Sequence, residues 1–394
     1  MVNIEDDAID VNVLIVGAGH AGAECAMQLR NHNFSGTILL IGAEDSNPYQ
    51  RPPLSKAYLL DETDTDRIVL NAPDLYRQKD IMTVFGDAVV DLNDKSRVVQ
   101  TKQGRTISFG TCVLATGAAP RLLPGLSRAH VVRTIDDANR LKKDLKPGAR
   151  TLILGGGYLG LEIASAAASL DANVSVLEQA DSPMFGRVSA YTANRFQQKH
   201  ETAGTQILCG VVVTEVIQEE SIWRVKLSDE TVICADLLVV TIGAIPNSEI
   251  ASSAGIVCDN GIVVDHNCRT SSDHVYAIGD CSTGYYQNEG RLHRVESVQN
   301  ALEQARVAAA CISGVALPKR RVPTFWSEQH GHRLQVAGLV NPAIDYKDLT
   351  TDTDNGWLVE RYHDDVLCVV EAVDSPVEFM RSARQVSTQP MCSK

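Results

Sequence analysis

Two glycine-rich hexapeptides have the residue types and spacing that hold the pyrophosphate of a dinucleotide. GAGHAG occupies residues 17–22, GGGYLG occupies residues 155–160, and both fit G-x-G-x-x-G. In this pattern the first glycine permits a tight turn, the second lets phosphate approach the backbone, and the third lets a helix pack closely on a strand. N–H groups at the helix start then attract the phosphates. Two such turns predict two dinucleotides, or one dinucleotide and a degenerate duplicate.

The first hexapeptide has the flanking elements that this chemistry requires. The apolar run VNVLIVG (11–17) predicts a strand before the turn, and AGAECAMQLR predicts a helix after it. A second apolar run, GTILLIG (36–42), ends just before Glu44, whose carboxylate is expected to accept hydrogen bonds from ribose hydroxyls. We therefore predict a dinucleotide site that begins at Gly17.

The second hexapeptide has a more complete setting. TLIL (151–154) predicts a strand, an Ala-rich helix follows, and a second strand, NVSVLE, ends in Glu178, close to the spacing expected for ribose recognition. A carboxylate accepts a bond from a ribose 2′-hydroxyl but repels a 2′-phosphate, by up to ~4 kcal/mol per charge pair. Gln179 and Ala180 offer no compensating cation. The second site is therefore predicted to prefer NADH over NADPH.

Other segments must close the sites. The prolines of NPYQRPPLSKAYL (47–59) predict a constrained loop that positions Arg51 and Lys56, with a purely structural loop as the alternative. TCVLATG (111–117) and the run that ends in Asp280 read as two further strands, and a long helix is expected from about Glu296. An Asp at a strand end can hold a polyol, and a helix start can stabilise negative charge on a ring. Both properties suit FAD.

Six segments occur in the following order along the chain: GAGHAG, RPPLSK, VLATGAAPR, GGGYLG with its following acid, AIGDC and RVESVQNALEQAR. Together they resemble the FAD-dependent NADH:ferredoxin reductases of bacterial oxygenase systems. Those enzymes serve Rieske-type aromatic-ring dioxygenases and some cytochromes P450, and share the glutathione-reductase-like fold. The resemblance runs from about residue 11 to about residue 382. It implies an α/β chain with two Rossmann-like, three-layer nucleotide-binding domains, one for FAD and one for NADH, and a C-terminal α+β domain with an antiparallel sheet.

The resemblance also implies roles for individual residues. Lys56 and Glu162 would pair near the flavin N5 and the nicotinamide as the catalytic residues, although Glu162 could merely complement the helix dipole. Trp326 would lie over the flavin region, with core packing as its alternative. Relatives often have Gly-Asp where this chain has Gly42-Ala43-Glu44, so the FAD ribose acid moves one position. The expected FAD residues are Gly17, Gly19, Ala21, Gly22, Glu44, Arg51, Lys56, Val89, Thr116, Gly117, Arg133, Asp280, Val298 and Trp326, and the expected NADH residues are Gly155, Gly157, Tyr158, Leu159, Gly160, Glu162, Glu178 and Gly243.

Domain boundaries follow from the motifs. A discontinuous FAD domain is expected at about 1–119 and 248–318, with an NADH domain at 120–247 inserted into it. The C-terminal domain, 319–394, carries short alternating runs such as RLQVAGLV, GWLVERYH and VLCVVEAV, which predict an antiparallel sheet. The tail STQPMCSK is expected to be loose.

The cysteines bear on where the electrons go. The ten cysteines are dispersed, none lies in 42–70, and no C-x-x-C occurs, so disulfide, peroxidase and coenzyme-A-disulfide chemistry is disfavoured. Electrons are then expected to pass directly to a 2Fe–2S ferredoxin. Its docking cations are expected to be Arg291, Arg294 and the cluster Lys319, Arg320 and Arg321, unless these are ordinary surface. The rivals are a rubredoxin reductase, an NADH oxidase and a non-catalytic FAD protein of the apoptosis-inducing-factor type.

Composition limits the partners and the compartment. A net charge of −13 argues against nucleic acid, which requires a concentrated basic face. No span approaches the roughly 20 apolar residues of a membrane helix. The acidic N-terminus lacks the order of a signal peptide, and scattered cysteines read as reduced thiols and show no metal-like grouping. We therefore expect a cytoplasmic protein.

Overall fold

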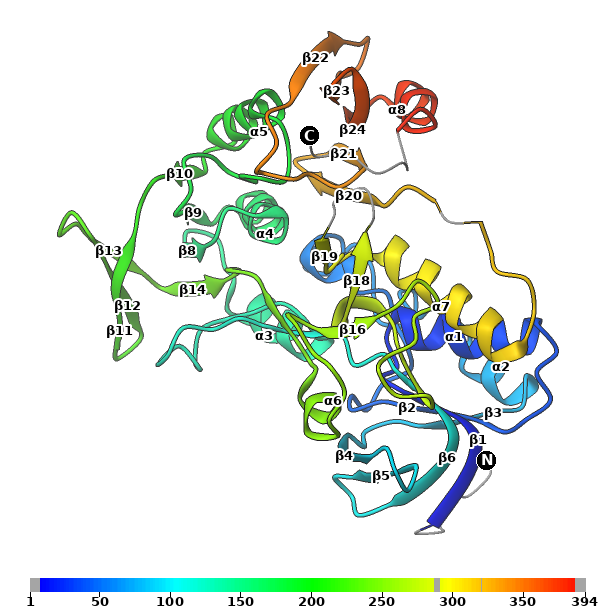
Figure 1. Cartoon of the computed structure of the whole chain (residues 1–394). Coiled ribbons are helices and arrows are strands. Elements are labelled where there is room, and N and C mark those ends of the chain that lie inside the picture. Colours follow the sequence, from blue (N-terminus) through cyan, green and yellow to red (C-terminus); the bar gives the residue numbers. More distant parts are fainter. Residues whose placement is uncertain (1–7, 287–290, 320, 387–394) are drawn as a thin grey trace.

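The computed structural model describes residues 8–286, 291–319 and 321–386. Three units are visible in Figure 1: one around β1, β6, α1 and α7, one around β8, β9 and α4, and one around β20 to β24. Each is built on its own main sheet. We refer to them as the first, second and third units.

The first unit contains a seven-stranded sheet that is parallel at its centre, where buried runs of Val, Leu and Ile form strands with both faces covered. Parallel pairs join β3 to β2, β2 to β1, β1 to β6 and β6 to β17, whereas β5 and β4 continue from β6 as an antiparallel edge. The strands are β1 (Ala8–Val16), β2 (Ile38–Ile41), β3 (Ile81–Val84), β4 (Val89–Asn93), β5 (Val98–Thr101), β6 (Thr106–Leu114) and β17 (Val275–Ala277).

The pairing of β17 shows that the first unit is discontinuous in sequence. Val275 lies opposite Cys112 and Ala277 lies opposite Leu114, in parallel register. The chain leaves this sheet after β6, builds the second unit, and returns to the same sheet.

Layers cover both faces of the first sheet. Helices α1 (His20–Asn31) and α7 (Val298–Ser313) pack together on one face, over side chains such as Ile15 and Leu40. The opposite face buries Leu14 and Leu39 with residues of α6 and β16. The smaller elements of this unit are α2 (Pro73–Gln78), α6 (Glu249–Ser253), β16 (Ile262–Val264), β18 (Ser282–Tyr286) and β19 (Arg291–His293), with 3₁₀ turns η1 (Pro52–Ser55) and η2 (Gly279–Cys281).

The second unit is a four-stranded parallel sheet in the order β10-β9-β8-β14. Helices α3, α4 and α5 pack on one face, and the three-stranded antiparallel sheet β11-β12-β13 packs on the other. The pair β7 (Ala118–Pro120) and β15 (Ala244–Pro246) links the second unit to the first. The elements of the second unit are α3 (Ile135–Asp144), β8 (Arg150–Leu154), α4 (Tyr158–Ser169), β9 (Asn173–Leu177), α5 (Ala190–Thr202), β10 (Gln206–Leu208), β11 (Val213–Glu219), β12 (Ile222–Leu227), β13 (Val232–Ala235) and β14 (Leu237–Val240).

The third unit is a five-stranded antiparallel sheet in the order β20-β21-β24-β23-β22, as the alternating runs predict. It shares one apolar cluster with the second unit, in which the rings of Phe196 and Trp357 meet at 5.8 Å. The third unit is therefore packed onto the second unit. Its elements are β20 (Thr324–Gln329), β21 (His332–Ala337), β22 (Lys347–Asp352), β23 (Trp357–His363), β24 (Val366–Val373) and α8 (Pro376–Ala383).

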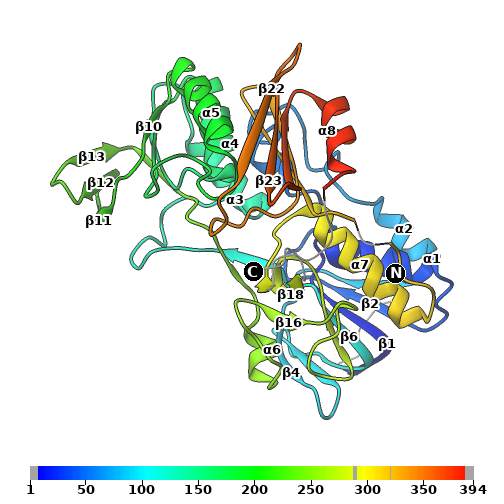
Figure 2. The same cartoon turned by 45° about the horizontal axis from the view of Figure 1, so that its top comes forward.

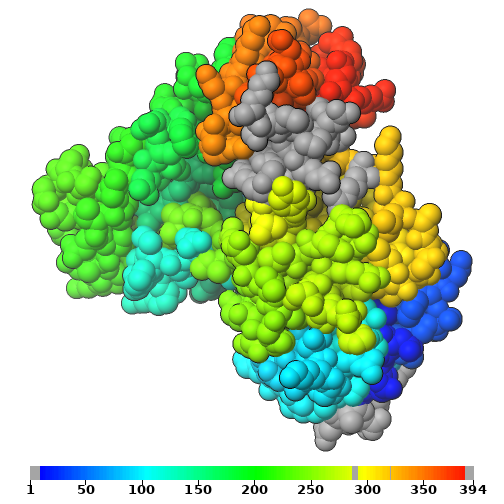
Figure 3. All heavy atoms as spheres, viewed as in Figure 1, coloured from blue at the N-terminus to red at the C-terminus, as the bar shows by residue number. Residues whose placement is uncertain are grey.

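The fold class predicted from the sequence is confirmed by two parallel three-layer units and one antiparallel unit. Figure 2, turned by 45°, shows α7 and α1 side by side on the first unit and the β11–β13 sheet at the far edge of the second. Figure 3 shows the surface hollowed between the second unit, in green, and the lime part of the first. The boundaries at residues 119, 247 and 318 stay a prediction. Among the described residues, no helix is long and apolar enough to cross a membrane.

Candidate active site

The two glycine turns have the same geometry. Gly17 and Gly155 have φ angles of +113° and +104°, which an L side chain rarely adopts. A Cβ on Gly22 would lie 1.9 Å from the Gly17 carbonyl oxygen, and a Cβ on Gly160 would lie 2.0 Å from that of Gly155. These third glycines therefore allow α1 and α4 to pack against their own turns.

The middle glycines differ from the others because they face open space. A Cβ on Gly19 or Gly157 would meet no protein atom within 4 Å. Each of these residues is also the N-cap of its helix, so backbone N–H groups border the open space. This is the arrangement that lets a pyrophosphate approach the backbone.

A cavity of about 590 Å³ begins at the first turn. Its walls come from the first turn, the loop at 44–56, the ends of β6 and β17, the start of α7, the start of α4, and β20. The predicted site residues that line it are Gly17, Gly19, Ala21, Glu44, Arg51, Lys56, Thr116, Gly117, Arg133, Asp280, Val298 and Trp326 from the FAD set, and Leu159 and Glu162 from the NADH set.

Two predicted FAD residues do not line this cavity. Gly22 lies beneath the turn, where its missing side chain allows close packing. Val89 lies on β4 opposite Thr101, and its side chain packs against the apolar cluster on the other face of the sheet. A contact of Val89 with FAD stays a prediction.

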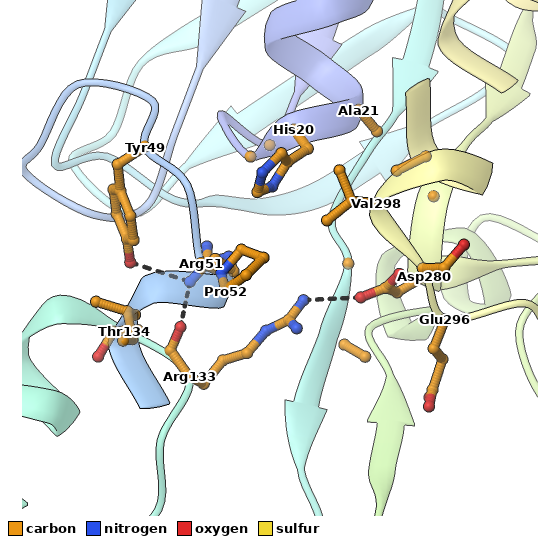
Figure 4. A pocket seen from close by; sticks show the side chains of 18 of the residues that line it. His20, Ala21, Tyr49, Arg51, Pro52, Arg133, Thr134, Asp280, Glu296 and Val298 are labelled. Atoms are coloured by element: carbon orange, nitrogen blue, oxygen red, sulfur yellow. Dashed lines mark hydrogen bonds and ion pairs between the residues drawn. The ribbon is translucent and has the colours of Figure 1, made fainter. Parts of the chain in front are cut away.

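The side chains of Arg51 and Arg133 lie in the middle of the cavity (Figure 4). The Arg133 guanidinium lies 3.1 Å from the Asp280 carboxylate, and Arg51 donates to the Arg133 carbonyl oxygen at 2.5 Å. Burial, together with the charges of Arg51 and Arg133, lowers the pKa of His20 to about 4. Each of the two guanidinium groups has a carboxylate partner in the cavity, Arg133 with Asp280 and Arg51 with Glu44, so the charges in this part of the cavity are balanced.

Glu44, the predicted FAD ribose acid, already has protein partners. Arg51 lies 2.7 Å from one of its oxygens, and the Tyr49 hydroxyl donates to the other at 2.5 Å. Tyr49 also lies 5.1 Å from the Arg51 guanidinium, which stacks over its ring. The three side chains form one edge of the cavity, and the ribose contact of Glu44 stays a prediction.

Lys56 and Glu162 meet where the first and second units join. Lys56 Nζ lies 2.5 Å from Glu162 Oε2, and Ser55 donates to the same oxygen at 2.7 Å. Ser327 of β20 donates to Glu162 Oε1 at 2.7 Å. The ammonium also lies 5.0 Å from the centre of the Trp326 ring. All three units thus contribute to the surroundings of one carboxylate.

The remaining predicted NADH residues lie around the second turn, outside this cavity. Glu178 accepts from the backbone N–H groups of Gly156 at 2.7 Å and Ala180 at 2.8 Å, which places its carboxylate beside the turn. The Tyr158 ring stacks on Phe325 of β20 at 4.3 Å. Gly155, Gly157 and Gly160 form the turn and the start of α4, and Gly243, at φ +105°, lies between β14 and β15.

Sequence reasoning missed three residues of the site: His20, Tyr49 and Ser327. Each lies inside or beside a motif that was recognised, within GAGHAG, within NPYQRPP, and directly after Trp326. A polar residue in a buried strand was the available signal for Ser327, which is 0% exposed.

The long helix expected from about Glu296 is present: it starts at Val298, with Ser297 as its N-cap, and the Ser297 hydroxyl accepts from the Asn300 N–H at 3.1 Å. One other expectation needs correction. Arg294 is not a free docking cation: its side chain is 10% exposed and is paired with Glu296. Arg320 and the side chain of Arg291 lie outside the described residues, as does the tail 387–394.

The first dinucleotide turn lines the cavity, and the helix that follows the second turn reaches the same cavity through Leu159 and Glu162, where Glu162 pairs with Lys56. This arrangement defines an oxidoreductase that brings a nicotinamide nucleotide to a flavin. The sequence pattern of the pyridine nucleotide-disulphide oxidoreductase family matches residues 11–305, and that of the reductase C-terminal family matches residues 324–391. The chain belongs to the pyridine nucleotide-disulphide oxidoreductase family, among the flavoprotein reductases, and its cofactors are FAD and NAD(P)H.

Individual proteins resemble this chain over nearly its whole length. A protein named probable ferredoxin reductase CtmF, from Castellaniella defragrans, is 38% identical over 388 residues, which are 97% of this chain and 95% of that protein. Rubredoxin-NAD(+) reductase from Pseudomonas putida is 35% identical, covering 92% of this chain and 96% of that protein. The structure of a covalent putidaredoxin reductase–putidaredoxin complex matches with a TM-score of 0.90 and 34% identity, covering 95% of this chain and 92% of that chain.

Proposed function

We propose that the protein is an NADH:ferredoxin oxidoreductase, in which FAD takes electrons from NADH and a 2Fe–2S ferredoxin carries them to an oxygenase. The oxygenase would be an aromatic-ring dioxygenase or a cytochrome P450. The observation that carries the proposal is the Lys56–Glu162 pair, because it joins a wall of the FAD cavity to the helix of the second dinucleotide turn. The full-length similarity to ferredoxin reductases supports the choice of acceptor.

The residues of the cavity fit FAD. The open space at Gly19 accepts the pyrophosphate, and backbone N–H groups at the start of α1 offset its charge. Asp280 has a carboxylate that can accept from the hydroxyls of a ribityl chain, and the N-terminus of α7 at Val298 offers N–H groups to the ring. When bound, the flavin supplies the conversion of a two-electron hydride donor into single electrons.

Glu178 would select NADH at the second turn. Its two carboxylate oxygens are held by backbone N–H groups of Gly156 and Ala180, so the charge cannot turn away from the nucleotide. A 2′-phosphate would bring a second anion to this point and be repelled. The preference for NADH rests on this repulsion.

Lys56 and Glu162 would orient the reacting rings and keep the charge between them balanced. Lys56 presents a cation to the cavity from a 3₁₀ turn that prolines 52 and 53 stiffen. Leu159, one turn before Glu162 on α4, adds an apolar surface against which a ring can rest. Trp326 closes the same region from β20.

The electrons would leave without a protein thiol. None of the described residues that line the cavity is a cysteine, and none of the nine cysteines in the described part of the chain forms a disulfide bond. Lys319 and Arg321 are exposed just before β20, and are the described cations closest in sequence to Trp326 among those expected to dock an acidic ferredoxin. Cysteines that stay reduced also support the proposal that the protein works in the cytoplasm.

Steady-state assays test this function. NADH-dependent reduction of cytochrome c that requires added 2Fe–2S ferredoxin is the expected result. Equal or faster turnover with rubredoxin would identify a rubredoxin reductase instead, and rapid oxygen consumption without a carrier would identify an NADH oxidase. A long-lived complex after NADH addition, with no turnover on any acceptor, would favour a signalling FAD protein.

A further inference from the structure

One face of β20 carries polar side chains where the packing of two units calls for apolar ones. Ser327 and Gln329 lie on this face, against α4 and α5, and are 0% and 1% exposed. Burying a hydroxyl and an amide is unfavourable unless each finds a hydrogen-bond partner. Their partners therefore indicate why these residue types occur here.

The two side chains belong to a hydrogen-bond chain that ends at Glu162. His330 Nε2 lies 3.1 Å from His200 Nδ1, and His200 Nε2 lies 3.0 Å from Gln329 Oε1. Gln329 Nε2 lies 3.1 Å from Ser327 Oγ, and Ser327 Oγ lies 2.7 Å from Glu162 Oε1. The chain connects α5, β20 and α4, and His330, at its outer end, is half-buried.

The chemistry of these groups gives the chain one direction. An ionised carboxylate only accepts, so Ser327 donates its hydrogen to Glu162 and accepts from an N–H of Gln329. The amide oxygen of Gln329 then faces His200, which must carry its hydrogen on Nε2. Nδ1 of His200 is left as the acceptor for an N–H of His330. Every hydrogen in the chain points towards Glu162.

We propose that Ser327, Gln329 and His200 are positioning residues that hold the Glu162 carboxylate ionised and fixed beside Lys56. This inference deepens the proposed function and rests on it, because the role of Glu162 beside the nicotinamide is assigned there. It makes the third unit part of the hydride-transfer site. Ser55 and Lys56 supply donors to the second carboxylate oxygen, so both sides of the carboxylate are fixed.

The charged and titratable groups around the chain agree with this direction. Lys56, the residue directly after η1, is the charged side chain that faces Glu162, and His200 of α5 and His330, directly after β20, are the titratable groups connected to it through the chain. Lys199 and His332, which lie 2.9 Å apart, flank His330. Burial lowers the pKa of His200 to about 4, so this imidazole is neutral at pH 7, as the chain requires.

The test compares two serines that donate to buried glutamates between the second and third units. Ser327→Ala removes the donor to Glu162, whereas Ser189→Ala removes the Ser189 hydroxyl, which lies 2.7 Å from Glu371 away from the cavity. In Ser327→Ala, the ionised Glu162 carboxylate loses one hydrogen-bond donor. The acid limb of the pH profile of NADH-dependent reduction should therefore move up by about one pH unit. Rapid mixing of the FAD-loaded enzyme with NADH across pH, without an acceptor, measures this limb. Ser189→Ala should leave it unchanged.

A second readout follows Glu162 itself. Infrared titration of the FAD-loaded protein, with the carboxylate band assigned by Glu162→Gln, should show the same upward shift in Ser327→Ala and a smaller one in His200→Leu. The proposal would be overturned if neither Ser327→Ala nor His200→Leu changed the acid limb of the pH profile or the titration of Glu162. An equal shift in Ser189→Ala would also overturn it. Reduction by NADH with no transfer to ferredoxin would instead contradict the proposed function and leave this inference standing.

Discussion

Lys56 Nζ lies 2.5 Å from Glu162 Oε2, although 106 residues separate the two in sequence. The two side chains are only 16% and 7% exposed, so the attraction between them is weakly screened by water. Glu162 is anchored by α4, which opens at the second dinucleotide turn, and Lys56 by the loop of the first unit. The pair thus fixes the approach of the second unit to the cavity at the first turn.

Replacing Lys56 by Met should slow NADH-dependent reduction by about 10- to 100-fold, the loss expected when a charge-assisted interaction disappears. Lys142→Met is the matched control, because Lys142 pairs with Asp61 at the surface, outside the cavity. Anaerobic rapid mixing with NADH measures both. A Lys56→Met enzyme as fast as Lys142→Met would remove Lys56 from the reaction.

Replacing Glu178 by Arg should shift the preference towards NADPH by roughly 100-fold, measured as the ratio of kcat/KM for the two nucleotides. The substitution exchanges repulsion of the 2′-phosphate for attraction. Glu215→Arg makes the same charge change on exposed β11 and should leave the ratio as it is. If the Glu178→Arg ratio also stays unchanged, nucleotide choice is made elsewhere.

Two glycines of the second turn, Gly160 and Gly157, are expected to respond differently when each is replaced by alanine. Gly160→Ala places a Cβ 2.0 Å from the Gly155 carbonyl oxygen, which should cost about 1–3 kcal/mol of unfolding free energy. Gly157→Ala meets open space at φ −74°, so it should keep the stability and weaken NADH binding. Denaturant unfolding and nucleotide titration separate the two effects. Tight NADH binding by Gly157→Ala would show that the pyrophosphate does not lie at this turn.

Stability should fall as the pH is lowered from about 6.5 to about 4, because the folded state holds His200 neutral with its pKa reduced to about 4 by burial. In that window the unfolded chain binds a proton that the folded chain does not, an effect of up to roughly 3 kcal/mol that vanishes at higher pH. His200→Gln should flatten this part of the profile, measured by urea unfolding. His274→Gln, at an exposed position, should not, and equal slopes for both variants would contradict the prediction.

Local pattern was sufficient for the parts of the fold that are governed by neighbouring residues. The three roles of Gly17, Gly19 and Gly22 follow from one turn, and the structure has the strand before it and the helix after it. The alternation of apolar and polar residues in the C-terminal runs predicted the antiparallel sheet, because this pattern also depends only on neighbouring residues. The Lys56–Glu162 pair came from the resemblance, since nothing in either segment alone relates them.

Contacts between distant segments could not be predicted from periodicity. The bond from Ser327 to Glu162 joins residues 165 apart, and Arg294, whose side chain is 10% exposed, also donates to the carbonyl oxygen of Ala244, 50 residues away. Burial decides whether such a charge is a docking surface or an internal partner. That information appears only once the units are packed.

The parallel pairing of β17 with β6 affects the order in which the protein can fold while the ribosome synthesises it. Val275 must be synthesised before Cys112 gains its second strand neighbour, on β17, so the cavity at the first turn stays open along one wall while the whole inserted unit emerges. The inserted sheet, whose strands all lie between residues 150 and 240, can close by itself in the meantime. The nascent chain is therefore expected to fold its second unit before the cavity of the first unit is complete.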